Sequence, residues 1–257
     1  MKFFYGIDGT GVDMKMGDGY VENICISAAL LWSGRKFRKL NPPDHKRLFL
    51  DSGGFTFFSK TGEYPFTVEQ YANLSSTIDA DYVACMDYPC EDSISRSVHK
   101  TNSDRINATI ENTIKCHEIE GPNWVTVIQG DHVSEYMECC KLIKENNLET
   151  PLMAVGSICR RRKVQDLLDV LVPIKSKFSS YDLHGFGVDL RQISDRRVRW
   201  LLWSSDSQAW RLSRNGRLRF PRNTEDKIRN FNSYKKRIDS ILYTDAEQVT
   251  LPKGVFV

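Results

Sequence analysis

Four polar residues stand at or just after the ends of short apolar runs: Asp51, Asp87, Gln129 and Asp206. Two carboxylates beside one sugar can transfer a glycosyl group, because one attacks the anomeric carbon while the other moves the proton. A third carboxylate with an amide suits a purine edge, since the carboxylate accepts from N–H groups and the amide donates to a carbonyl oxygen. If these residues meet, the residue types predict glycosyl transfer at a purine base.

Glycine and serine accompany these polar residues. The sequence reads D-S-G-G-F at 51–55, Q-G at 129–130 and V-G-S at 155–157. An aspartate after a strand is often only a helix N-cap, and a glycine there often only turns the chain. Helix capping alone does not require a polar residue at the end of every strand. The occurrence of polar residues after several strands therefore favours a binding site.

The elements that must position these residues alternate between strand and helix. Short, nearly continuous apolar runs predict strands at 48–51, 82–86, 124–128, 152–155, 181–186 and 200–205, with an earlier one near 3–7 or 24–28. Apolar residues three and four apart predict helices that begin at Thr67, cover 103–118, 134–145 and 164–171, and start again after Thr224.

This alternation predicts a parallel sheet with right-handed crossovers. We expect an α/β fold of the (β/α)8 TIM-barrel type, in a single domain over residues 1–257. A doubly wound open sheet is the alternative, although the sequence has no strong G-x-G-x-x-G. In a barrel, the strand ends that carry the polar residues share one rim, where the active sites of such barrels are built.

Positive charge is concentrated late in the chain. The 257 residues carry a formal charge of +3, but residues 196–237 contain thirteen Lys and Arg against three Asp and Glu. Such asymmetry predicts a nucleic-acid-binding segment at 196–237, with a solvated basic surface as the alternative.

Other features exclude whole classes of protein. With 40% hydrophobic residues, the chain has enough apolar material to exclude intrinsic disorder. Apolar runs are too short for a membrane span, and the N-terminal MKFFYGIDGTG does not resemble a secretory signal. The seven cysteines lack the paired spacing of a zinc site, so we expect reduced thiols, no metal and a cytoplasmic location.

The motifs in chain order resemble the tRNA-guanine transglycosylase superfamily. They are D-S-G-G-F, M-D-Y-P, V-I-Q-G, A-V-G and S-S-D-S, between about residues 48 and 215. The resemblance implies a (β/α)8 barrel and the exchange of guanine in a nucleic acid for a 7-deazaguanine base.

The resemblance also implies residue roles. Asp206 would be the nucleophile that attacks C1′ and forms a covalent glycosyl intermediate, and Asp51 would be the general acid/base. Asp87 and Gln129 would read the base, whose carbonyl would accept from the Gly156 amide. Further base contacts would come from Ser52, from Phe55 by stacking, and from His184 and Phe186 on a loop over the other face.

Two departures from the tRNA enzymes point to DNA as the substrate. The chain lacks their C-x-C-x-x-C…His zinc motif, and S-S-D-S-Q-A-W replaces their F-D-C-x-x-P-T-R. A compact chain without the zinc-binding subdomain, and rich in Lys and Arg at 35–39, resembles the phage and bacterial DNA-modifying branch. Those relatives insert 7-deazaguanine derivatives that protect DNA from restriction.

We therefore expect a DNA guanine transglycosylase that inserts a preQ0-type base without a cofactor, in the host cytoplasm if the chain is phage-encoded. Five arginines close to Asp206 are the expected DNA contacts: Arg211, Arg214, Arg217, Arg219 and Arg222. The target guanosine would be flipped out of a duplex or supplied single-stranded. A homodimer is a further expectation. The alternatives are a zinc-free tRNA enzyme, a non-catalytic nucleic-acid-binding accessory subunit and, from the carboxylates alone, a glycosidase.

Overall fold

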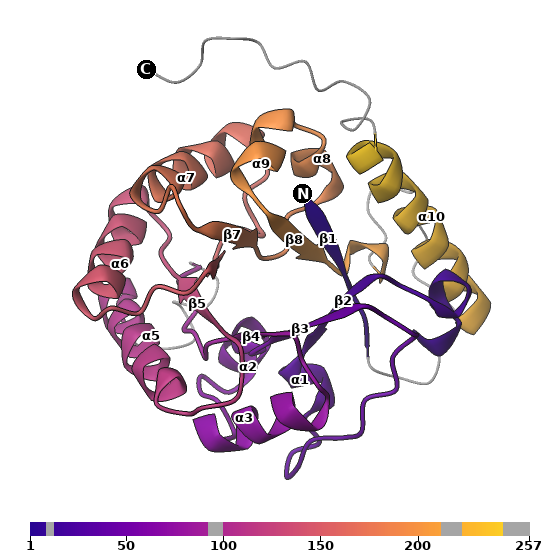
Figure 1. Ribbon diagram of the computed structural model, residues 1–257, viewed down its shortest axis with the longest axis horizontal. Coiled ribbons are helices and arrows are strands. Elements are labelled where there is room, and N and C mark those ends of the chain that lie inside the picture. The colour runs from indigo at the N-terminus through magenta and orange to yellow at the C-terminus, as the bar shows by residue number, and fades with distance from the viewer. Residues whose placement is uncertain (9–12, 92–99, 212–222, 244–257) are drawn as a thin grey trace.

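Eight parallel strands close into a barrel in the order β1 to β8, with β8 paired to β1. The computed structural model describes residues 1–8, 13–91, 100–211 and 223–243, and Figure 1 shows the strands surrounded by helices. The strands are β1 Lys2–Gly6, β2 Asn23–Ser27, β3 Arg47–Asp51, β4 Tyr82–Ala84, β5 Trp124–Ile128, β6 Leu152–Val155, β7 Asp182–Gly185 and β8 Ser204–Ser207. The predicted (β/α)8 barrel is confirmed, and closure excludes the open sheet.

Helices form most of the connections between the strands. They are α1 Ala28–Leu31, α2 Gly54–Lys60, α3 Val68–Thr77, α5 Asn102–His117, α6 Val133–Glu145, α7 Val164–Lys177, α8 Leu190–Ile193, α9 Arg196–Leu201 and α10 Thr224–Tyr243, with 3-10 turns η1 Asp13–Gly19 and η2 Ala209–Arg211. The Thr67 side chain caps α3 and forms the predicted capping box with Gln70. No described helix is long and apolar enough to cross a membrane.

The barrel interior has its own apolar cluster, separate from the layer between strands and helices. Its buried members are Phe4, Cys25, Phe49, Ala84, Val125, Val127, Leu152 and Ala154. Asp51, Gln129 and Gly156 each come two residues after a cluster member on β3, β5 or β6. Because alternate strand residues face the same side, the register directs these three residues toward the interior, above the cluster.

The last strand differs from the prediction. Residues 196–201 form helix α9, capped by Asp195, and β8 begins only at Ser204. A continuous apolar run such as W-L-L-W does not distinguish a buried helix end from a buried strand. At the other end of the chain, both early segments are strands, since β1 and β2 cover 2–6 and 23–27.

Phe49 tests the inner cluster. Its ring is fully buried and stacks on His184, with 4.4 Å between ring centroids. Phe49→Ala should lower the free energy of unfolding, measured by urea titration, by about 3–5 kcal/mol, because it opens a cavity in a closed core. Tyr243→Ala, at a side chain that is 70% exposed, should change it by less than about 0.5 kcal/mol. Equal effects of the two substitutions would contradict this packing.

Candidate active site

Three carboxylates from distant parts of the sequence interact at one end of the barrel. Asp51 ends β3, Asp87 follows β4 and Asp206 lies in β8. Burial, followed by the charges of Asp87 and Asp206, raises the pKa of Asp51 to about 7. An effect of this kind requires nearby charges, so the structure brings the three predicted acids together.

The D-S-G-G-F segment fits closely around Asp51. The nearby Ser27 side chain and Gly53 N–H favour the charged carboxylate and partly oppose the rise of the Asp51 pKa. Gly53 has φ +81°, and a Cβ there would lie 2.8 Å from atoms of Ala29, so only glycine fits the turn into α2.

Asp206 is held through one carboxylate oxygen. Its Oδ1 accepts a hydrogen bond from the Gly187 N–H at 2.9 Å and lies 3.3 Å from His184 Nε2. The side chain is 15% exposed, so it is oriented by the protein and still reaches solvent.

His184 lies in β7 and not on the expected covering loop. The ring has no exposed surface, and its Nδ1 lies 2.8 Å from the Ser204 hydroxyl. Phe186 follows the strand directly and packs on the inner cluster, with 5.8 Å between its ring centroid and that of Phe49. The ring is buried and both its nitrogens have protein partners, so the structure corrects the expected place of His184 from a covering loop to a strand.

Asp87 is the centre of a polar network. Its Oδ1 accepts a 2.7 Å hydrogen bond from Ser52, and its Oδ2 accepts one from the Gln129 amide. Burial raises the pKa of Asp87, while these two hydrogen bonds act in the opposite direction. The Tyr64 hydroxyl lies within 2.8 Å of Ser52 Oγ and 2.7 Å of the Asp87 carbonyl oxygen.

Gly156 contributes space for a neighbour. Its N–H, which the sequence analysis expected to donate to a base carbonyl, donates to the Ile128 carbonyl at 3.0 Å in this structure. Its own carbonyl accepts from the Tyr136 hydroxyl at 2.9 Å. A Cβ at this position would overlap the Gln129 amide, so glycine lets that side chain lie flat against the backbone.

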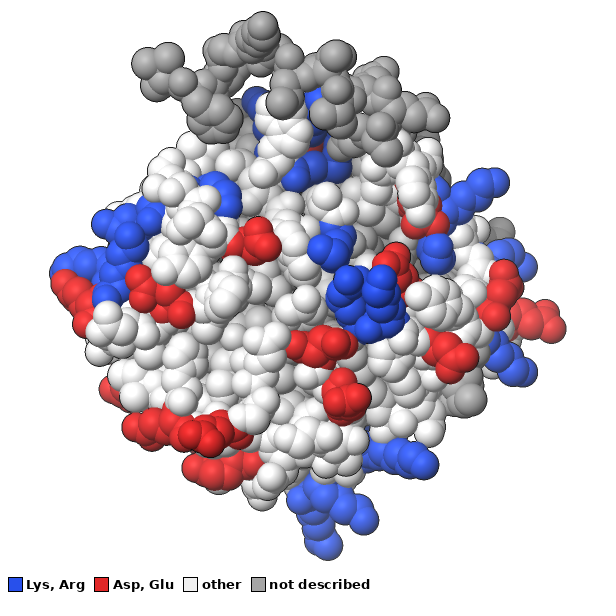
Figure 2. All heavy atoms as spheres, in the orientation of Figure 1, with Lys and Arg blue, Asp and Glu red and all other residues white. Residues whose placement is uncertain are grey.

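The remaining predicted contacts lie at the edge of the site or beyond it. Phe55 on α2 is half-buried, and the Arg160 guanidinium lies 5.0 Å from its ring centroid. Arg211 forms an ion pair with Asp8, which Lys227 also approaches at 3.7 Å. The other predicted DNA contacts, Arg214, Arg217, Arg219 and Arg222, lie outside the described residues. On the face drawn in Figure 2, basic and acidic side chains are interleaved.

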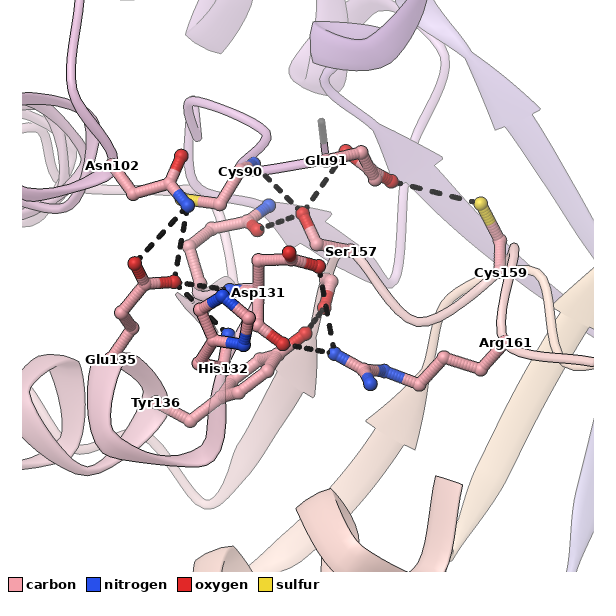
Figure 3. Close-up of polar contacts among 12 residues, drawn as sticks. Cys90, Glu91, Asn102, Asp131, His132, Glu135, Tyr136, Ser157, Cys159 and Arg161 are labelled. Atoms are coloured by element: carbon pink, nitrogen blue, oxygen red, sulfur yellow. Dashed lines mark hydrogen bonds and ion pairs between the residues drawn. The ribbon is translucent and has the colours of Figure 1, made fainter. Parts of the chain in front are cut away.

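Sequence reasoning missed several residues of the site, which Figure 3 shows in part. Glu91 is buried, and its Oε2 lies 3.0 Å from the hydroxyl oxygen of Ser157, which also lies 2.7 Å from Gln129 Oε1. The only available signal was weak, namely a carboxylate four residues after Asp87 and a serine after Gly156.

A second group in Figure 3 holds the loops after β5 and β6. The Glu135 carboxylate accepts from the backbone N–H groups of Asp131 and His132 at 2.7 and 3.1 Å. Arg161 donates to the Asp131 carbonyl, which ties the two loops together. Within the residues that the structure describes, no cluster of three or more His, Cys, Asp or Glu is arranged to hold a metal ion.

The raised pKa of Asp51 makes a prediction for stability. The folded-state pKa of about 7 lies above the value of about 3.9 in an unfolded chain, so this group's contribution is fully present at low pH and is lost as the pH rises to about 7. Asp51→Asn should therefore become progressively more stable than the parent protein between about pH 4 and pH 7.

Urea titrations across this pH range give the measurement. Glu111→Gln, at an exposed carboxylate on α5, is the control and should show no comparable trend. A stability difference for Asp51→Asn that does not change with pH would show that Asp51 ionises as it does in water.

Comparison with known proteins agrees with this geometry. A search of curated proteins found no match. The family model for DpdA, described as DeoxyPurine in DNA protein A, matches residues 25–256, a range that includes all three carboxylates. The chain therefore belongs to the DpdA family, a tRNA-guanine transglycosylase-like family for 7-deazaguanine DNA modification.

Proposed function

We propose that this chain exchanges guanine in DNA for a 7-deazaguanine base of the preQ0 type, through a covalent intermediate on Asp206. Family membership supports a transglycosylase-like role on DNA. One observation supports the proposal: the charges of Asp87 and Asp206 both raise the pKa of Asp51, as expected if a nucleophile and a proton carrier share one site.

The first half-reaction breaks the bond between guanine and C1′. An Asp206 carboxylate oxygen attacks C1′, and the electron pair of the broken bond stays on the departing base. Oδ1 is held by Gly187 and His184, which fixes the direction of the carboxylate before attack. Asp51 delivers its proton to the base, so guanine leaves as a neutral molecule.

The second half-reaction reverses these roles. Asp51, now a carboxylate, takes the proton from the ring nitrogen of the incoming 7-deazaguanine, and that nitrogen attacks C1′. The ester bond to Asp206 breaks and its carboxylate is restored. A pKa of about 7 suits this work, because a group that titrates near neutral pH can both give and accept the proton.

Base recognition falls to Asp87 and Gln129. The Asp87 carboxylate can accept from the N1–H and the exocyclic amine of a guanine-type base, and the Gln129 amide can donate to its carbonyl oxygen. Ser52 donates to Asp87 and orients it, while Phe55 with Arg160 at the edge of the site can pack on the ring. Gly156 acts through the space that it leaves for Gln129.

The DNA must present its target base outside the stack. The anomeric carbon is inaccessible in a duplex, so we expect a flipped-out or single-stranded guanosine. The basic segment 196–237 would bind phosphates, and binding of this kind weakens strongly with added salt.

Replacing the nucleophile tests the mechanism. Asp206→Ala should lower incorporation of a labelled 7-deazaguanine into DNA by at least about a thousandfold, because the covalent step has no substitute. Asp182→Asn, at an exposed carboxylate at the opposite end of β7, is the matched control and should retain full incorporation.

The same assay on tRNA separates the substrates. Label in DNA and not in tRNA supports the proposal, whereas label in tRNA alone would replace DNA by tRNA as the substrate. Full incorporation by Asp206→Ala would remove Asp206 from the nucleophile role. Absence of exchange by the parent chain on either nucleic acid would favour an accessory role.

A further inference from the structure

A continuous chain of hydrogen bonds connects Asp87 to a buried acid that the reaction above does not use. The Gln129 amide bridges Asp87 Oδ2 and the Ser157 hydroxyl, with 2.7 Å between Gln129 Oε1 and Ser157 Oγ. Ser157 Oγ continues to Glu91 Oε2 at 3.0 Å and accepts from the Cys90 N–H at 2.8 Å. Figure 3 shows Ser157 between Cys90 and Glu91.

Counting hydrogens limits how this chain can be protonated. A serine hydroxyl donates one hydrogen bond and accepts two. Ser157 already accepts from Cys90, so of its two remaining partners, Gln129 and Glu91, one must receive a hydrogen and the other must supply one. A Glu91 carboxylate and a Gln129 carbonyl oxygen cannot both satisfy it, because both are acceptors.

Two arrangements satisfy every contact. In the first, protonated Glu91 donates to Ser157, Ser157 donates to Gln129 Oε1, and the Gln129 NH2 faces an ionised Asp87. In the second, the amide is turned over, Gln129 donates to Ser157, Ser157 donates to ionised Glu91, and Asp87 must carry the proton. Each arrangement holds one proton on the two carboxyl groups.

Only the first arrangement suits a guanine-type base. It leaves Asp87 as a pure acceptor for two N–H groups and turns the second amide hydrogen of Gln129 toward a base carbonyl. In the second arrangement, Asp87 is neutral and already donates its hydrogen to Gln129. The Gln129 carbonyl oxygen then takes the place of the amide hydrogen that would face the base carbonyl, and the two oxygens repel each other.

We propose that Glu91 is a positioning residue that holds the single proton of this chain and thereby fixes, through Ser157, the amide orientation with which Gln129 and Asp87 recognise a guanine-type base. The inference rests on the proposed function for the identity of the base. The hydrogen count itself depends only on the contacts within the protein.

The surroundings of Glu91 favour its neutral form. Its residue surface is 7% exposed, and burial raises the pKa of its carboxyl group. Asp87 acts in the same direction, and the positive charge of Arg160 opposes it. The charged and titratable groups that face Glu91 are Asp87, Cys90, Arg105, Tyr136, Cys159 and Arg160.

Ser157 is held in place by an unusual backbone conformation. Its φ is +53°, in the left-handed region that residues other than glycine seldom adopt. This turn places the hydroxyl between Gln129 and Glu91, and the surrounding contacts offset the strain.

Infrared spectroscopy tests the proton without any turnover. Protein labelled with 13C in its glutamate carboxyl groups should show a protonated-carboxyl band near neutral pH, and this band should be absent from Glu91→Gln. Absence of the band from the parent protein, or its persistence in Glu91→Gln, would overturn the proposal. Because the free protein is used, this result is independent of whether the chain exchanges bases.

The pH dependence of base exchange tests the role. As Glu91 ionises, the KM of the parent protein for the incoming base should rise by about tenfold per pH unit. Glu91→Gln keeps an N–H donor toward Ser157 at every pH, so its KM should stay lower than that of the parent by a factor that grows with pH. Glu91→Leu and Ser157→Ala break the chain and should raise KM across the whole range.

Glu111→Gln is the control and should follow the parent protein. A Glu91→Gln profile identical to that of the parent would overturn the proposal, as would a normal KM for Glu91→Leu. Failure of the parent protein to exchange any base would contradict the proposed function, and the infrared result would then decide the proton's position alone.

Discussion

The arrangement of this site depends on the free-energy cost of holding several carboxyl groups close together at one end of a barrel. Asp87 and Asp206 lie close enough to Asp51 for their charges to raise its pKa, and Glu91 is a further acid that is buried nearby. Such groups persist only where hydrogen bonds or shared protons offset the lost hydration. The protein uses both means, which gives chemically similar side chains different states.

The hydrogen bonds are distributed unequally among the acids. Asp206 accepts from a backbone N–H and lies beside a buried histidine, while Asp87 accepts from a hydroxyl and an amide. Asp51 remains the acid whose pKa rises to about 7. Environments that give two carboxyl groups different pKa values allow one fold to use the same residue type both as a nucleophile and as a proton carrier.

The inner apolar cluster makes these positions rigid. Phe49 stacks on His184 two residues before Asp51, so one ring lies beneath two polar groups of the site. His184 transmits this support to Asp206, and Ser204 orients the other ring nitrogen. A close-packed core therefore supplies orientation that flexible loops would not provide.

Much of this architecture can be predicted from the sequence, because buried parallel strands are apolar and polar residues follow directly after their ends. This pattern predicted the barrel, most element positions, the three carboxylates and Gln129, with the resemblance to a known superfamily supplying their roles. It misplaced the last strand, because the W-L-L-W run suits a helix end equally well. It also assigned His184 and the Gly156 amide to the base, although both are occupied within the protein.

The sequence by itself determined the periodicity of the elements and hence which polar residues share the rim of the barrel. Only the tertiary structure decided which of these residues bond to one another, and it added Glu91, Ser157 and Tyr64 to the site. The physical reason is that strand periodicity is a local property, whereas hydrogen-bond partners depend on distances between segments far apart in the chain. Proton positions depend on burial as well, which no local pattern records.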